Sequence, residues 1–214
     1  MLFFFPNKRN RLLTKLIQAF PKEYTADVEA VFKGLTTKTN AYKTVEYYAC
    51  NRSFYSDETT EWSLLSGEKI KIPYRVYLSD KLVFQNKLTA RQQLIYHCIF
   101  SRCYDGYVRQ KHIEALLDSD IPEWAMPYII KICDEYVYEI LEVIYQKLKT
   151  RNCETYKALC QRNFDYFKLG HCRMISYWNE YYRYDCYKYK NYLGKKLYGE
   201  CFGYNKTGQK SIQF

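Results

Sequence analysis

Apolar residues recur every three or four positions through most of this chain, which is the spacing of one buried helix face. One such set lies between Arg9 and Phe20, and another between Val28 and Leu35. Pro21 separates them because proline cannot continue a helix. The pattern predicts two short helices, the second capped at its start by Thr25.

A different pattern follows the polar stretch 36–60, which fits either a helix or a strand and for which we favour a helix. Trp62 to Tyr77 alternates apolar with polar positions, which is typical of a half-buried strand. The predicted apolar face carries Ile70, Ile72, Tyr74 and Val76. Ser66 and Gly67 can turn the chain, and Pro73 removes one backbone donor, so we expect an edge position for this strand.

From Leu88 onward the apolar spacing is again helical. Thr89 and Gln92 match a capping box, in which each side chain accepts from the other residue's backbone N–H. Asp105-Gly106 predicts a turn, and the run ending at Pro122 predicts a further helix start. Pro127 predicts a kink or a fresh start. A long apolar stripe then extends from Ile129 to Leu148.

The spacing continues to the end of the chain, through residues 156–164 and then 170–202. We therefore expect a mainly α protein, a multi-helix array or bundle with one small β-hairpin near residues 61–77. The organisation predicted is a single domain, 1–214. Its parts are an N-terminal helical part with the hairpin (1–87), a helical core (88–169), a basic tyrosine-rich helix (170–202) and a frayed tail (203–214).

Composition adds an unusual surface to this picture. Aromatic residues make up 19% of the chain, with 25 tyrosines, and the formal net charge is +10. Tyrosine has an apolar ring and a polar tip, so many rings should lie half exposed. An excess of positive charge favours polyanionic partners, although it also serves solubility alone.

The nine cysteines are odd in number and contain no Cys-x-x-Cys pair, which speaks against a secreted disulfide scaffold. Buried reduced thiols in a cytoplasmic protein are the simpler reading. The opening Phe cluster precedes Lys8 and Arg9, the reverse of the order in a signal peptide. No run of apolar residues is long enough to span a membrane. We therefore expect a soluble, cytoplasmic protein.

Two resemblances bear on the fold. The segment 105–109 together with Ala115-Leu116-Leu117 resembles the second helix of a HEAT-like repeat, which implies stacked helices around residues 89–148. The runs 72–77, 105–110, 135–137 and 173–180 look like parts of a group of bacterial proteins of unknown function. This second resemblance implies a bacterial, cytoplasmic origin and supplies no catalytic residue.

The C-terminal segment contains the strongest candidate for function. Cations and aromatic rings interleave there, a pattern in which Lys and Arg neutralise phosphates while rings stack on unpaired bases. The candidate nucleic-acid-binding residues are Arg173, Tyr177, Trp178, Arg183, Lys188, Lys190, Lys195 and Lys196. Further rings nearby are Tyr181, Tyr182, Tyr184, Tyr187, Tyr189 and Tyr192. An amphipathic helix with rings inward and lysines in water explains the same pattern.

Two charged groups are secondary candidates. A second basic group, which could extend the first if the termini meet, comprises Lys8, Arg9, Arg11 and Lys15. An acidic stripe on the predicted long helix comprises Asp134, Glu135, Glu139 and Glu142. Carboxylates so spaced could hold a divalent metal, but the Glu-x-x-His pairs of di-iron bundles are missing from the sequence. Solvated helix faces explain both groups.

The sequence contains few residues arranged as a catalytic or metal site. His97, Cys98, Cys103 and His112 are zinc-type ligands, but the adjacent His97 and Cys98 should point to different faces of a helix. A nucleophilic pair of Cys103 with His112 is conceivable across a turn. The sequence contains no dinucleotide fingerprint and no P-loop. We therefore expect no cofactor and no metal, and we lean away from an enzyme.

The sequence leaves three functional hypotheses. The first is a non-enzymatic binding protein that engages RNA or DNA through the C-terminal surface, with salt-dependent affinity. The second is a protein–protein interaction or regulatory module, binding a partner or forming a homodimer through its tyrosine-rich face. The third is an unrecognised enzyme, which would need a deep pocket that collects titratable groups.

Overall fold

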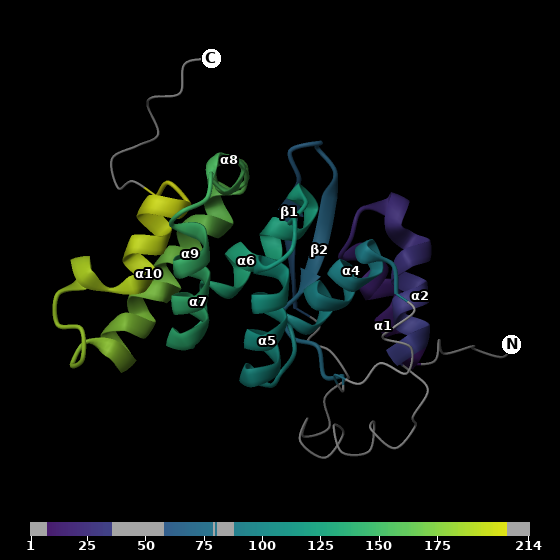
Figure 1. Cartoon of the computed structure of the whole chain (residues 1–214), viewed down its shortest axis with the longest axis horizontal. Coiled ribbons are helices and arrows are strands. Elements are labelled where there is room, and N and C mark those ends of the chain that lie inside the picture. Colours follow the sequence, from purple (N-terminus) through teal and green to yellow (C-terminus); the bar gives the residue numbers. More distant parts are fainter. Residues whose placement is uncertain (1–7, 36–57, 79, 81–87, 205–214) are drawn as a thin grey trace, which may run out of the picture. The chain divides into compact units, whose positions relative to one another are not determined.

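A computed structural model of the chain describes residues 8–35, 58–78, 80 and 88–204, with side chains described from Arg11 onward. Across these residues the protein is mainly helical, with one two-stranded antiparallel sheet (Figure 1). This confirms the predicted fold class. The chain divides into two compact units, Met1–Tyr128 and Ile129–Phe214. That they form one domain stays a prediction.

The hairpin of the first unit consists of β1 (Thr59–Ser63) and β2 (Lys69–Pro73). The strands pair antiparallel with Trp62 opposite Ile70, and both side chains are fully buried. Gly67 has a φ of 91° in the connecting turn, a left-handed conformation that favours glycine. The predicted hairpin is therefore confirmed.

One position of the predicted apolar face is wrong. Tyr74 is 39% exposed, whereas Ile72 and Val76 on either side of it in the pattern are fully buried. The strand ends at Pro73, which is itself buried, and the two-residue alternation ends with it. Alternation predicts side-chain direction only while the backbone stays extended.

Two helices precede the hairpin, α1 (Lys8–Gln18) and α2 (Thr25–Leu35), as the apolar spacing predicts. A short 3-10 turn, Lys22–Tyr24, joins them. Thr25 does not cap α2: its backbone is already helical, and its hydroxyl donates to the carbonyl of Lys22 at 2.7 Å. The predicted cap is wrong because the 3-10 turn starts the helical path earlier. After α2, residues 36–57 of the polar stretch 36–60 lie outside the described residues, and the helix favoured for this stretch is wrong at its end, because Thr59 and Thr60 belong to β1.

Helix α4 (Ala90–Phe100) begins at the predicted capping box. The backbone N–H of Gln92 donates to Thr89 Oγ1, and that of Thr89 donates to Gln92 Oε1, each at 3.2 Å. Helix α5 (Gly106–Leu117) begins where the sequence predicts a turn. Asp105 is its N-cap and accepts from the N–H groups of Tyr107 and Val108. The turn prediction is corrected to a helix start.

A backbone bridge ties the chain after the hairpin to the α4–α5 connection. The N–H of Val76 donates to the carbonyl of Arg102 at 2.8 Å, and the N–H of Tyr104 donates to the carbonyl of Val76 at 3.1 Å. The buried Arg102 side chain donates to the carbonyls of Pro73 and Tyr74. These bonds fix the chain leading to residue 80 beside both helices.

The long apolar stripe predicted from Ile129 to Leu148 is broken. A 3-10 turn (Glu123–Ala125) leads into α6 (Met126–Ile132), with Pro127 in the first helical turn, as the fresh start there predicts. After a non-helical stretch, α7 (Tyr138–Leu148) begins. Two short helices therefore replace the predicted long one.

In the second unit, α7 is followed by α8 (Glu154–Arg162) and α9 (Phe164–Tyr177). Phe167 of α9 stacks on Tyr198, with ring centroids 5.0 Å apart and an interplanar angle of 9°. A Cβ placed on Gly170 would lie 2.9 Å from the Tyr198 hydroxyl oxygen and 3.3 Å from Asp134 Cβ. Glycine at this position therefore allows a close approach of α9 to its neighbours.

The predicted C-terminal helix, 170–202, is wrong as a continuous element. Helix α9 already includes 164–170 and passes into a π-helical turn, Trp178–Tyr182. The chain then leaves helical structure before a 3-10 turn, Tyr189–Asn191. Helix α10 (Leu193–Lys196) and a π-helical turn (Leu197–Cys201) follow. The predicted division between the helical core (88–169) and the C-terminal helix (170–202), both parts of one domain, therefore falls inside α9, and residues 205–214 of the predicted tail are not described.

Two further expectations can be compared with the structure. Within the described ranges, none of the helices has the length and apolar character needed to cross a lipid bilayer. The cysteines in those ranges are free thiols, and most of them are buried. Cys50 lies outside the described residues.

Candidate functional site

The loop between α9 and α10 presents aromatic rings to solvent, and it projects from the side of its unit in Figure 1. Tyr181, Tyr184 and Tyr187 are 56%, 94% and 75% exposed. Arg183, Lys188 and Lys190 between and beside them are also exposed. We call these six residues the tyrosine loop. It combines ring faces and cations within ten residues of chain.

Ring packing at its base holds the tyrosine loop. Tyr182 stacks on the buried Tyr192, with centroids 5.8 Å apart and an interplanar angle of 24°. The Tyr182 hydroxyl donates to the carbonyl of Tyr136. Trp178 Nε1 donates to the carbonyl of Cys186 at 2.9 Å, inside the loop itself. These contacts hold the loop at Trp178, Tyr182, Cys186 and Tyr192.

Only part of the predicted nucleic-acid-binding set belongs to this exposed surface. Tyr177 and Trp178 are half-buried and pack on other rings, Trp178 on Tyr189 at 5.0 Å. Lys195 and Lys196 are half-buried on α10. Arg183, Lys188 and Lys190 remain. The exposed rings beside them are present in the sequence prediction, which puts them on one continuous helix. In the structure Tyr184 and Tyr187 follow the π-helical turn that ends at Tyr182.

Arg173 is bound to a buried carboxylate and not to the tyrosine loop. Its guanidinium donates from Nη1 to Asp134 Oδ2 at 2.8 Å, and the same carboxylate oxygen accepts from the Tyr166 hydroxyl at 2.8 Å. The buried Lys131 ammonium donates to that hydroxyl at 2.9 Å. We call these four residues the Asp134 cluster. It is a network within the second unit, so Arg173 is not part of the exposed tyrosine loop.

The predicted acidic stripe is wrong because it includes Asp134, a member of this cluster. Asp134 and Glu135 lie in the non-helical stretch between α6 and α7 and are each 5% exposed, whereas Glu139 and Glu142 are exposed on α7. The four carboxylates do not share one helix face because the helix is interrupted. Lys131 and Tyr166, which sequence spacing did not connect, are the actual neighbours of Asp134.

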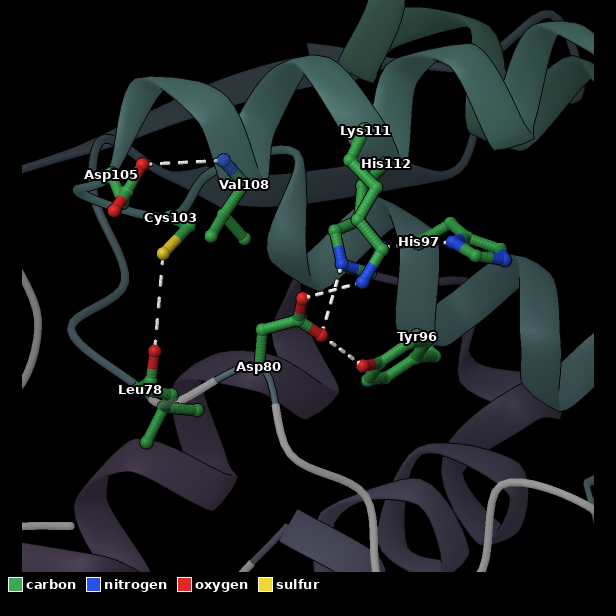
Figure 2. Close-up of polar contacts among 9 residues, drawn as sticks. All are labelled: Leu78, Asp80, Tyr96, His97, Cys103, Asp105, Val108, Lys111 and His112. Atoms are coloured by element: carbon green, nitrogen blue, oxygen red, sulfur yellow. Dashed lines mark hydrogen bonds and ion pairs between the residues drawn. The ribbon is translucent and has the colours of Figure 1, made fainter.

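A second polar cluster lies in the first unit and joins α4 and α5 through Asp80 (Figure 2). The Asp80 carboxylate accepts from the Tyr96 hydroxyl and, at 2.8 Å, from the Lys111 ammonium. His112 Nε2 lies 3.2 Å from Asp80 Oδ1, close to it but not aligned as a hydrogen bond. His97 Nδ1 and His112 Nδ1 are 2.8 Å apart. We call these five residues the Asp80 cluster.

The arrangement selects one proton pattern. Partial burial opposes the charge on Asp80, but hydrogen bonds from Lys111 and Tyr96 lower the pKa of its carboxyl overall. An ionised carboxylate only accepts, so His112 carries its proton on Nε2, facing Asp80. His112 Nδ1 must then accept from His97 Nδ1, and both imidazoles are neutral. Burial lowers the pKa of His112 to about 4 and, together with Lys111, lowers that of His97.

The predicted cysteine chemistry does not occur in this cluster. The Cys103 thiol donates to the carbonyl of Leu78 at 3.9 Å instead of pairing with His112 (Figure 2). Burial raises the pKa of Cys103 to about 11, so it stays protonated and weakly nucleophilic. Cys98 is fully buried, and its pKa is raised by burial. Over the described part of the chain, no three His, Cys, Asp or Glu side chains gather as metal ligands.

Sequence reasoning found the two histidines of the Asp80 cluster but not their partners. Asp80 is 16 residues from Tyr96 and 31 residues from Lys111 along the chain. No helical or strand period links residues so far apart, and the backbone bridge at Val76 brings them together. The predicted basic group on α1 has Arg11 exposed and Lys15 half-buried, while the side chains of Lys8 and Arg9 are not described. That it extends another surface stays a prediction.

No family model, no curated protein and no solved structure matches the chain significantly. The HEAT-like and bacterial resemblances therefore stay predictions.

Proposed function

We propose that the protein is a non-enzymatic binding protein that engages single-stranded nucleic acid through the tyrosine loop. The observation that carries this proposal is the exposure of three rings, Tyr181, Tyr184 and Tyr187, beside three exposed cations. Rings this exposed contribute little to the core of their own unit. Base stacking on an aromatic face contributes about 1–3 kcal/mol per base and accepts any sequence.

Charge in the loop supports the rings but does not dominate. Arg183, Lys188 and Lys190 are accompanied by two exposed carboxylates, Glu180 and Asp185. The local excess of positive charge is therefore small, although the whole chain carries +10. Three phosphate contacts on a single strand give a slope of log affinity against log salt of about −2. Shallow salt dependence together with strong dependence on the rings is the expected signature.

The test is fluorescence anisotropy of a labelled single-stranded oligonucleotide titrated with the full chain. The double variant Tyr184→Ala with Tyr187→Ala should weaken binding by at least tenfold, because each lost stack costs about 1–3 kcal/mol. Tyr107→Ala is the matched control, since Tyr107 is 87% exposed but lies in the other unit. Unchanged affinity in a folded double variant would contradict the proposal.

A second pair of variants examines the cations. Lys188→Glu with Lys190→Glu should flatten the salt dependence and weaken binding, because two phosphate contacts become repulsive. Lys149→Glu with Lys168→Glu changes the net charge equally at exposed lysines outside the loop. An equal loss in both pairs would indicate nonspecific attraction by net charge. A dimer that dissociates only in the tyrosine double variant would instead favour the protein-interaction hypothesis.

A further inference from the structure

The Asp80 cluster leaves one of its ring nitrogens open to solvent. His97 Nδ1 is bonded to His112 Nδ1, so the other ring nitrogen of His97, Nε2, points away from the cluster (Figure 2). Among the residues that the structure describes, no group bonds to His97 Nε2, and this atom is not enclosed, whereas His112 Nε2 is. His97 is half-buried and His112 is fully buried. The chain of polar contacts therefore leads from Asp80 through a buried ring to a nitrogen at the surface.

The proton pattern of the cluster leaves a lone pair on this nitrogen. Because Asp80 is ionised, His112 carries its proton on Nε2 and accepts at Nδ1 from His97. The single proton of the neutral His97 ring is therefore held on Nδ1, and Nε2 has none. Burial and the charge of Lys111 keep His97 neutral at pH 7 by lowering its pKa. A neutral imidazole whose free lone pair reaches solvent can act as a nucleophile.

The groups behind His97 stabilise the charge that forms when this lone pair is used. A new bond at Nε2 makes the His97 ring positive, which strengthens its Nδ1–H donation to His112. His112 Nε2 lies 3.2 Å from Asp80 Oδ1, and the Tyr96 hydroxyl and the Lys111 ammonium hold the same carboxylate. A contact that is stronger in the transition state than before it accelerates the reaction. A carboxylate that orients an imidazole in this way activates histidines in enzymes.

The charge that the cluster exposes to solvent is positive. The side chain of Lys111 is 63% exposed, whereas that of Asp80 is only 15% exposed. The Lys111 ammonium lies 2.8 Å from Asp80 Oδ2, on the carboxylate that also faces His112. Lysine attracts phosphate as a point charge. An anionic reagent that approaches His97 is therefore favoured over a neutral one of similar size.

We propose that His97 accepts a phosphoryl group at Nε2 from a low-molecular-weight phosphoramidate, with His112 and Asp80 as positioning residues. The Nε2 lone pair attacks phosphorus, a new N–P bond forms, and the P–N bond of the donor breaks with release of ammonia. The nitrogen of the zwitterionic donor already carries the protons of ammonia, so no further proton is needed. The His97 ring takes the positive charge and keeps its proton on Nδ1. No residue of the tyrosine loop takes part, so this proposal and the binding proposal fail independently.

The test treats the full chain with potassium phosphoramidate at pH 7.5 and follows the intact mass, with peptide mapping in alkaline buffer to preserve phosphohistidine. The mass should rise by one phosphoryl group, located on His97. His112 and His171, the other histidines of the chain, are buried internal controls and should stay unmodified. In the urea-unfolded chain all the histidines should react, and His97 should react there about tenfold more slowly than in the folded protein. An equal or faster reaction of His97 in the unfolded chain would overturn the proposal.

Asp80→Asn tests the positioning role because it reverses the proton pattern and leaves the acceptor in place. Lys111 keeps the amide oxygen, so the amide N–H faces His112 Nε2, and His112 then donates from Nδ1 to His97. The proton of His97 moves to Nε2, and the rate should fall about tenfold or more. An unchanged rate in a folded Asp80→Asn variant would overturn the proposal.

Nuclear magnetic resonance of the unsubstituted chain gives a test that does not depend on the folding of a variant. Long-range ¹H–¹⁵N spectra show which ring nitrogen of a histidine carries the proton. We expect the proton of His97 on Nδ1 and that of His112 on Nε2. A proton on His97 Nε2 in the folded protein would leave no lone pair for the attack and would overturn the proposal.

Lys111→Gln tests the preference for an anionic donor. The neutral reagent diethyl pyrocarbonate also attacks imidazole nitrogens, so the ratio of the two rates on His97 cancels any change in its nucleophilicity. Lys111→Gln should lower the ratio of the phosphoramidate rate to the pyrocarbonate rate severalfold. Lys168→Gln removes an exposed lysine of the other unit and should leave the ratio unchanged. Equal ratios in the two variants would contradict the role of Lys111.

Discussion

Acidification should destabilise the first unit through the Asp80 cluster, and His112 should carry much of the effect. In the unfolded chain its pKa is near 6.5, and in the folded protein burial lowers its pKa to about 4. Between these values the unfolded state binds a proton that the folded state does not. A lowered pKa of this kind stabilises the folded state above pH 6.5, and the stabilisation is lost as the pH falls towards 4.

The magnitude follows from the two pKa values. Each unit of difference is worth about 1.4 kcal/mol, so His112 gives at most about 3 kcal/mol between pH 6.5 and pH 4. The imidazole is fully shielded from solvent, so solvent screening does not reduce this figure much. His97 acts in the same direction, since its pKa is also lowered. A loss of this size is a large fraction of the free energy of unfolding of a typical domain, about 5–15 kcal/mol.

The measurement is urea denaturation at several pH values from 7.5 to 4.5, followed by tryptophan fluorescence. A Trp178→Phe background restricts the signal to Trp62 and Trp124, which both lie in the first unit. The matched variant is His112→Gln, which keeps a polar side chain but cannot titrate. The difference in unfolding free energy between parent and variant should shrink as the pH falls from 6.5 to 4.5. A difference that stays constant over this range would refute the reasoning.

Three further changes give expected outcomes in urea denaturation followed by circular dichroism. Gly170→Ala should lower the free energy of unfolding by up to about 2 kcal/mol. Alanine gains about 1 kcal/mol in helix propensity, but its methyl group would lie 2.9 Å from the Tyr198 hydroxyl oxygen, and such overpacking costs about 1–3 kcal/mol. An increase in stability would show that Tyr198 moves freely. Thr89→Ala should cost about 1 kcal/mol by removing half of the capping box, and no change would mean that α4 needs no cap. Arg173→Met should cost about 2 kcal/mol because Asp134 stays buried without its charged donor, and a gain in stability would show that the ion pair is dispensable.

Apolar periodicity predicted the elements whose burial it directly reports. Helices α1 and α2 and the hairpin were found because Leu12, Leu16, Val28 and Ile70 all face a core. The capping box at Thr89 was found because its chemistry is local, three residues apart. In both cases the signal in the sequence and its physical cause lie within one short, continuous stretch of chain.

Periodicity failed where spacing continued but the backbone hydrogen bonds did not. Cys133 and Val137 keep helical spacing across the break between α6 and α7, and Cys186 and Tyr189 do so across the break after α9. Apolar spacing reports which residues are buried and not whether one helix carries them. The Asp80 and Asp134 clusters were missed because their members come from separate elements. The site candidates changed accordingly, from a helix face to an irregular loop.

The stack of Tyr182 on Tyr192 at the base of the tyrosine loop has a consequence for the energetics of recognition. A loop that becomes ordered only on binding loses conformational freedom at that moment, and part of the affinity offsets this loss. Here the rings and hydrogen bonds at Tyr182, Trp178 and Tyr192 fix the loop while the protein folds. Under the proposed function, a single strand would therefore meet a preorganised surface, and Tyr182→Leu should weaken its binding although Tyr182 itself is not one of the proposed contact residues.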